Sequence, residues 1–162
     1  MDDPITFFLT WSTYGVWLPG DSRGWVEYRH GWQLPDPIKL VEARAKMAED
    51  ACLLSVSERQ IVAAQVAETC AYRGWVLHAI NCRSNHMHVV IGAADTTPKK
   101  IRTDLKAWRT RRLKERSNPR RENWWAERGS QRYVFDEESL STVIQYVTEA
   151  QDRKHLDQQP EA

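Results

Sequence analysis

The sequence predicts an α+β domain in which a ferredoxin-like antiparallel sheet carries helices on one face. The main observation is the order of the expected elements along the 162 residues: a strand, two helices, a two-stranded hairpin, a long helix and a final helix. A hydrophobic fraction of 41% is typical of a globular domain with its own core. We therefore expect one domain over residues 1–153, followed by a frayed tail over residues 154–162.

The composition also predicts a cytoplasmic protein with no membrane role. No apolar run approaches the roughly 18 residues that a membrane span requires, and the first residues lack the pattern of a secretory signal. The three cysteines form no CxxC pair, which argues against a disulfide framework and against a cysteine zinc site.

The first 50 residues are expected to form a strand, an irregular segment and a helix. Residues 5–13 (ITFFLTWST) are rich in aromatic and β-branched residues, which favours a largely buried strand. Residues 14–37 are interrupted by Gly and Pro, and the tryptophans between them argue for an ordered loop. Pro37 should open a helix that runs to Asp50.

A helix and a hairpin are expected in the middle of the chain. Ser57 and Gln60 form an S-x-x-Q capping box, and the helix that they start should run up to Gly74. Residues 75–82 and 86–92 have the composition of two strands joined by a three-residue turn, which predicts an antiparallel hairpin.

Two more helices are expected in the last third of the chain. Thr97 as N-cap and Pro98 at the first helical position predict a long helix to about Arg116. Residues 132–135 have the pattern of a short strand. The acidic residues 136–138 favour the start of a final helix, where the helix dipole stabilises negative charge.

The basic residues are concentrated, although the formal net charge is only +1. Eleven Lys and Arg residues lie between Lys99 and Arg121, against Asp104 and Glu115. We expect this segment to contact phosphates, with an affinity that falls steeply with salt, and the alternative is a solvated helix face. The candidate contacts are Lys99, Lys100, Arg102, Lys106, Arg109, Arg112 and Arg116.

Aromatic residues add candidate surfaces for base stacking. The chain has eight Trp and five Tyr residues, and stacking on such rings tolerates any base. Most of these rings should belong to the core, so we expect only two or three to touch DNA. The candidates are Trp11, Tyr14, Trp17, Trp108, Trp124 and Trp125.

The sharpest motif is His86-Met87-His88 inside an expected strand. Side chains two residues apart on a strand share a face, so both imidazoles can reach one divalent cation. The alternative is a pair of structural histidines. The neighbouring Asn85, the apolar residues that follow and the basic helix favour the metal site.

A tyrosine on the final helix is the second candidate for chemistry. Tyr146 lies beside the apolar stripe that the final helix carries, so its hydroxyl could reach the rim of the core. A phenol with a pKa of about 10 is a poor nucleophile, but a metal-bound phosphate would be an easier target. Simple packing is the alternative role for Tyr146. Tyr133 is a rival nucleophile, although its RYVF context favours a short strand.

Three runs of residues together resemble a known family. SNHMHVVI resembles the metal-binding strand of the single-tyrosine transposases of the HUH (His-hydrophobic-His) superfamily, and VIQYVTEAQ resembles their nucleophile helix. TWSTYGVWLPGD at residues 10–21 is similar to an early insertion found in proteins related to the REP-associated tyrosine transposases. The likeness runs from Ile5 to about Gln151.

The resemblance implies a mechanism and a partner. His86 and His88 would ligate Mg²⁺ or Mn²⁺, and Tyr146 would attack a phosphate of single-stranded or hairpin DNA. The product would be a covalent 5′-phosphotyrosine and a free 3′-hydroxyl, and strand transfer would need no ATP. Both homodimers and monomers occur among such relatives, so the oligomeric state stays open.

The third metal ligand departs from the family pattern. The family commonly has Gln or Asn four residues after the tyrosine, and here that position is Ala150. Glu149 and Gln151 are the candidate replacements. This departure leaves a second function open, a nucleic-acid-binding protein without catalysis. A metal-dependent phosphoesterase is a third, disfavoured because no cluster of Asp and Glu ligands accompanies the histidines.

Overall fold

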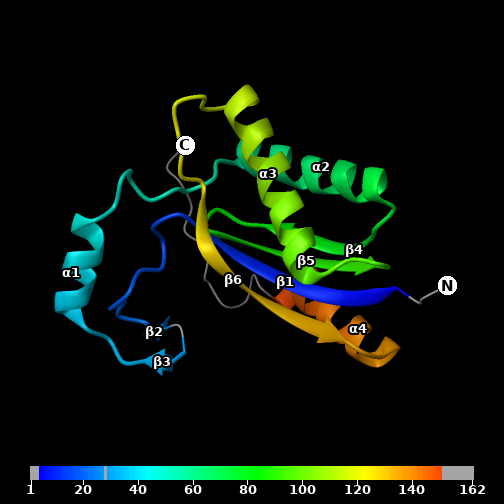
Figure 1. The fold of residues 1–162 in the computed structure, drawn as a ribbon, viewed down its shortest axis with the longest axis horizontal. Helices are drawn as coiled ribbons and strands as arrows, with labels where there is room; N and C mark the ends of the chain where they lie inside the picture. The colour runs from blue at the N-terminus through cyan, green and yellow to red at the C-terminus, as the bar shows by residue number, and fades with distance from the viewer. Residues whose placement is uncertain (1–3, 28, 151–162) are drawn as a thin grey trace.

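The structure, a computed structural model, describes residues 4–27 and 29–150 (Figure 1). The expected tail at residues 154–162 and the candidate ligand Gln151 lie outside the described residues. Among the described residues, none of the helices has the length and apolar character that a membrane crossing needs.

The body of the protein is a four-stranded antiparallel sheet with the strand order β4-β5-β1-β6. The strands are β1 (Ile5–Thr13), β4 (Val76–Cys82), β5 (His86–Ala93) and β6 (Trp125–Val134). The two helices α2 (Val56–Arg73) and α3 (Pro98–Arg116) cover one face (Figure 1). The predicted α+β class, the hairpin and the limits of the long helix at Pro98 and Arg116 are confirmed.

The last helix, α4 (Glu137–Gln145), lies on the opposite face of the sheet from α2 and α3 (Figure 1). The expectation of helices on one face therefore holds for α2 and α3 but not for α4. The strands explain this difference. Phe7 and Leu9 of β1 belong to the core beneath α2 and α3, whereas Phe8 packs with Val90 and Val147 in a second, smaller apolar cluster under α4.

Three predicted boundaries differ from the structure. Helix α2 starts at Val56 and uses Ser55 and Glu58 as its capping box, in place of Ser57 and Gln60. Helix α1 (Pro37–Ala45) ends before Asp50, and none of its residues is buried, so tertiary packing does not extend it. Strand β6 begins at Trp125 and not at residue 132. Its first residues have a polar sequence that does not by itself indicate a strand, and they become one because they pair with β1 at the edge of the sheet.

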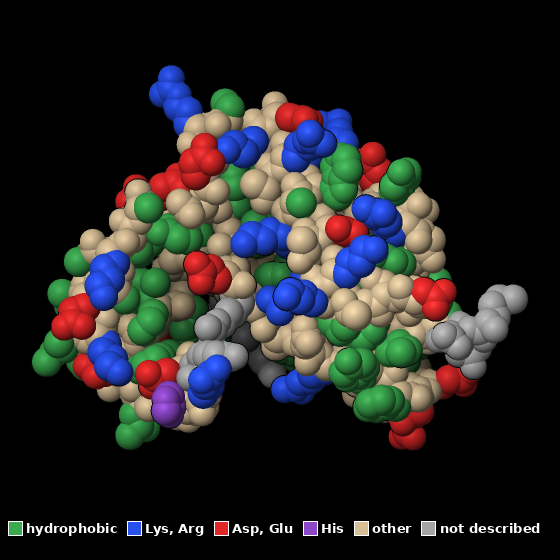
Figure 2. All heavy atoms as spheres, in the orientation of Figure 1, with side chains coloured by type: hydrophobic (Ala, Val, Ile, Leu, Met, Phe, Trp, Pro, Cys, Tyr) green, Lys and Arg blue, Asp and Glu red, His purple; other side chains and the backbone are tan. Residues whose placement is uncertain are grey.

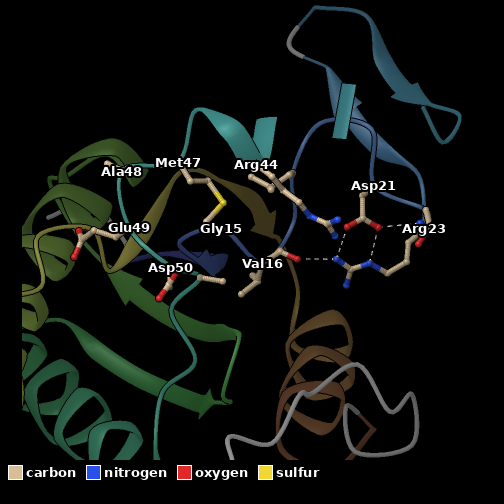
Figure 3. Close-up of a pocket in the computed structure, with 12 residues that line it drawn as sticks. Gly15, Val16, Asp21, Arg23, Arg44, Met47, Ala48, Glu49 and Asp50 are labelled. Atoms are coloured by element: carbon tan, nitrogen blue, oxygen red, sulfur yellow. Dashed lines mark hydrogen bonds and ion pairs between the residues drawn. The ribbon is translucent and has the colours of Figure 1, made fainter. Parts of the chain in front are cut away.

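Residues 14–54 form a lobe beside the sheet, which we call the insertion lobe. It contains α1 and the small hairpin of β2 (Trp25–Glu27) and β3 (Gly31–Gln33) (Figure 1). Its first turn is fixed by Arg23, which donates to both carboxylate oxygens of Asp21 and to the carbonyl of Val16 (Figure 3). This hydrogen bonding lowers the pKa of Asp21, so the carboxylate stays charged.

A buried arginine fills the core between α3 and the sheet. The guanidinium of Arg109 lies 4.4 Å from the ring centroid of Trp11 and 4.1 Å from that of Trp125, and the side chain is fully buried. Burial lowers the pKa of Arg109 to about 9, so the group is still charged at neutral pH. Nε donates to the carbonyl of Leu105.

This packing corrects four predicted DNA contacts. Arg109 and Trp11 are inaccessible to a phosphate or a base because both lie in the core. Trp124 and Trp125 are also buried, with 2% and 4% of their surface exposed. The sequence pattern of a basic helix did not reveal that one of its cations is sandwiched between indoles.

We predict that Arg109→Ala lowers the free energy of unfolding by about 3 kcal/mol, because it leaves a cavity between two indoles and removes their cation–π contacts. Arg109→Met should retain most of the stability, since it fills the space and removes a buried charge. Urea denaturation followed by tryptophan fluorescence measures both. An alanine variant as stable as the natural protein would contradict this account of the core.

Candidate active site

The two histidines of the HxH motif lie on the α4 face of the sheet. In the pairing of β5 with β1, His86 stands opposite Ser12 and His88 opposite Thr10, while Met87 is fully buried on the other face. The centroids of the two imidazole rings are 5.1 Å apart. The strand alternation therefore brings both rings to one place, as the spacing predicts.

Each imidazole is oriented by a hydrogen bond at Nδ1. Nδ1 of His88 lies 2.7 Å from Oγ1 of Thr10, and Nδ1 of His86 lies 2.7 Å from Oδ1 of Asn85. Metal-binding histidines commonly use one ring nitrogen for the ion and the other for such a bond, which fixes the ring. A divalent cation here would bind the Nε2 atoms and take its other ligands from phosphate or water oxygens. The donor set fits such an ion but supplies only part of its coordination.

Tyr146 lies beside these histidines in the same chain. Its ring centroid is 5.8 Å from that of His88, with the planes at 75°. Phe8 connects the group, because its ring stacks on His88 at 5.4 Å and meets the edge of Tyr146 at 6.3 Å. The predicted nucleophile and the predicted metal ligands thus come together although His88 and Tyr146 are 58 residues apart in the sequence.

The backbone at Tyr146 is not an ordinary α-helix. Residues Tyr146–Ala150 form a π-helical turn, η1, directly after α4. The turn is anchored to β4, since Asn81 Nδ2 donates to the carbonyl of Val147 at 2.9 Å. π-turns inside helices occur frequently at functional sites.

Tyr133, the rival nucleophile, belongs to the other face of the sheet. It stands opposite Phe7 in the pairing of β6 with β1, and the two ring centroids are 5.3 Å apart. Phe7 lies in the core beneath α2 and α3, away from the imidazoles. This geometry favours Tyr146 as the candidate nucleophile.

Glu149 is not brought to the histidines. Its side chain is exposed and lies 3.5 Å from the amide of Gln145, and no group of three His, Cys, Asp or Glu side chains within the described residues could hold a metal. The π-turn explains why the predicted position of Glu149 beside the histidines is wrong. Its hydrogen bonds run from i to i+5, so a position three residues after Tyr146 falls well short of a full turn. Gln151 lies outside the described residues.

A cavity of about 140 Å³ lies at the histidines and the tyrosine. The insertion lobe supplies part of its wall through Trp17 and Arg23, and the sequence reasoning did not select Arg23. No spacing rule links Arg23 to the HxH strand. The only signal near it is the preceding WLPGD run, which is part of the segment at residues 10–21 that resembles the early insertion of related transposases. The lining residues are Thr10, Ser12, Val16, Trp17, Arg23, Asn85, His86, His88 and Tyr146.

The basic helix α3 lies on the far face of the sheet from this cavity. Figure 2 shows Lys and Arg side chains over this part of the surface, with Asp and Glu among them. Two of the residues predicted to contact phosphates already interact within the protein. Arg112 forms an ion pair with Glu68 at 3.6 Å, and the guanidinium of Arg102 lies 5.9 Å from the centroid of the Trp11 ring. The exposed candidates are Lys99, Lys100, Lys106 and Arg116.

The remaining aromatic candidates differ in accessibility. Tyr14 is partly buried, and its hydroxyl accepts a hydrogen bond from the amide of Ala48, so it holds the insertion lobe together. Trp108 lies on α3 beneath Arg111, with 5.2 Å between the guanidinium and the ring centroid. Trp17 is 44% exposed and is the one tryptophan in the cavity wall. Arg132, which the sequence analysis passed over, is exposed and stands opposite Phe8 on the site face.

Comparison with known proteins places this site in context. The family described as IS200-like transposases matches residues 41–150, which is more than half of the chain. A REP-associated tyrosine transposase solved with a REP hairpin is similar in structure, with a TM-score of 0.60 and 12% identity over 95% of this chain and 70% of that one. A protein from Deinococcus radiodurans R1, provisionally described as a transposase, has a TM-score of 0.54 and 15% identity over 89% of this chain and 88% of that one.

No protein of curated function matches the chain. The two structural likenesses have low sequence identity and bear on the fold alone, whereas the family match covers the HxH strand, the basic helix and the tyrosine helix together. The chain therefore belongs to the IS200-like transposase family.

Proposed function

We propose that this transposase nicks single-stranded or hairpin DNA by attack of Tyr146 and then transfers the strand. One observation carries the proposal: Tyr146 and His88 lie 5.8 Å apart, between ring centroids, on the same face of one chain. The hairpin in the similar REP-associated transposase supports this class of substrate. The proximity within one chain supports an active site that needs no second copy.

The proposed chemistry is a transesterification: the phosphodiester bond is exchanged for a phosphotyrosine bond and is not hydrolysed. The phenol oxygen of Tyr146 forms a bond to phosphorus as the bond from phosphorus to the 3′-oxygen breaks. The phenol proton is released, and the leaving 3′-oxygen takes up a proton. Attack of a 3′-hydroxyl on the 5′-phosphotyrosine reverses these steps and joins the strand.

The residues around Tyr146 would prepare this step. A bound Mg²⁺ or Mn²⁺ would act as a Lewis acid on the phosphate. His86 and His88 would hold the cation, and Asn85 and Thr10 would keep the two rings in place through their Nδ1 bonds. Phe8 would fix the distance between the phenol and the imidazoles by packing against both.

A nucleic-acid-binding protein without catalysis is the second candidate function. The observation that favours it is the exposed Glu149, which forms no metal-holding group with the histidines among the described residues, together with Ala150 at the position where the family commonly has an amide. Such a protein would bind DNA without a metal requirement and would form no covalent product.

The covalent step is tested with labelled hairpin oligonucleotides and Mn²⁺. We expect an adduct that survives denaturation with the natural protein and with Tyr133→Phe, and none with Tyr146→Phe, because Tyr146 is the tyrosine beside the imidazoles among those that the structure describes. Gel electrophoresis under denaturing conditions measures the adduct. An adduct that persists in Tyr146→Phe would contradict the assignment, and no adduct with any metal would favour the binding protein.

The role of Thr10 is tested by Thr10→Val, which keeps the shape and removes the hydrogen bond to His88. We expect Mn²⁺ to bind roughly tenfold more weakly, measured by calorimetry without DNA, because the ring loses its orienting partner. Thr6→Val is the matched control, since Thr6 is on the same strand and face but opposite Gly92. Equal Mn²⁺ affinity in all three proteins would show that His88 does not bind the ion.

The third ligand is tested by comparing Glu149→Ala with Gln151→Ala. We expect Glu149→Ala to form adduct at nearly the natural rate, because its carboxylate is exposed and does not line the cavity at the histidines. Gln151→Ala should raise the Mn²⁺ concentration needed for half-maximal adduct formation by about tenfold, a loss of about 1.4 kcal/mol. The reverse order of effects would restore Glu149 as the ligand.

A further inference from the structure

The insertion lobe forms a second cavity, of about 630 Å³, between its small hairpin and the strands β1 and β6. We call it the aromatic groove. Its lining is largely apolar, and two of its indoles are accessible, with 44% of Trp17 and 59% of Trp32 exposed. Trp25 forms a buried part of the wall and donates its indole N–H to the carbonyl of Leu34. The apolar lining residues are Trp17, Leu18, Pro19, Trp25, Val26 and Trp32.

The two accessible indoles are held in fixed positions. Trp17 donates its N–H to the carbonyl of Gly24 at 2.8 Å, and the Arg23 guanidinium lies 4.4 Å from its ring centroid. Trp32 packs directly on Gly24, where a Cβ would come within 2.2 Å of Trp32 Cζ2. Gly24 also has a φ of +86°, which a larger residue adopts only with strain. The rings are therefore preorganised surfaces, with little entropy to lose on binding.

The aromatic groove is continuous with the candidate active site. Thr10, Ser12 and Trp17 line both the groove and the cavity at the histidines. Thr10 is also the hydrogen-bond partner of His88. An extended polymer bound at the histidines can therefore continue along the surface over Trp17 to Trp32.

We propose that the aromatic groove binds unpaired nucleobases of the DNA strand that flank the phosphate attacked by Tyr146, by stacking on Trp17 and Trp32. The proposal rests on the proposed function of the site. Indole faces stack on any base, which suits a strand without fixed sequence. Among the described residues, the charged members of the lining are Arg29 and Glu27, one of each sign, so the groove suits base faces better than phosphates.

A second copy of this chain is the rival occupant. The exposed apolar side chains of Leu34, Ile38 and Val41 would suit such a partner, but none of them lines the groove. Continuity with the histidines favours the nucleic acid.

The test measures DNA binding in the Tyr146→Phe background, so that no chemistry takes place. The probes are a blunt hairpin, the same hairpin with an unpaired tail on either side that contains 2-aminopurine, and the unpaired tail alone. Trp32→Ala should weaken binding of the tailed hairpin about tenfold and leave the blunt hairpin unchanged. Trp17→Ala should act likewise, and Trp17→Phe should restore much of the affinity. Tyr72→Ala, which removes an exposed aromatic ring from α2 on the far face of the sheet, is the matched control.

The outcomes separate this proposal from the proposed function. Equal affinity of the Trp32→Ala and parent proteins for tailed hairpins, or no binding of any probe, would overturn the groove as a base site. So would a dimer that Trp32→Ala dissociates in sedimentation without changing tail binding. If the natural protein forms no covalent adduct, the proposed function is wrong, but the result on DNA binding in the groove still holds. Thermal unfolding checks that each variant is folded.

Discussion

The pairing of β5 with β1 is the constraint on which the rest of the candidate site depends. Side chains alternate along β5, so one register buries Met87 in the main core and presents His86 and His88 on the opposite face. A slip of one residue would exchange these roles, placing imidazoles under α2 and α3 and a thioether at the site. The apolar residues Val89 and Ile91, which share the face of Met87, hold the register because both are fully buried.

The two faces of the sheet have different physical tasks. The face under α2 and α3 holds most of the buried residues, including Arg109 in its sandwich of indoles. The other face has a small apolar cluster, centred on Val90 and Val147, which is enough to seat α4 and its π-turn. The stable layer therefore supports the strand that carries the imidazoles, and the smaller cluster sets the position of the phenol.

Local signals in the sequence predicted those features that local physics decides. The N-cap Thr97 with Pro98 gave the start of α3, and the HxH spacing gave the shared face of the histidines. Long-range effects were missed: β6 is a strand because β1 pairs with it, and Arg109 is buried because two indoles from different strands enclose it. The π-helical turn at Tyr146 was also missed, and with it the change in spacing between Tyr146 and Glu149. Nothing in the spacing of Arg23 indicated that the insertion lobe reaches the cavity.

The exposed lysines on α3 and the imidazoles lie on opposite sides of the sheet, separated by the thickness of the sheet and of one helix layer. This separation restricts which form of nucleic acid can touch both. Double-stranded DNA has a persistence length of about 150 base pairs, so a short stem can lie flat against only one side. An unpaired stretch bends freely and can pass around the outer edge of β6. For the proposed hairpin substrate, this arrangement would place the junction of a stiff stem and a pliable strand near that edge.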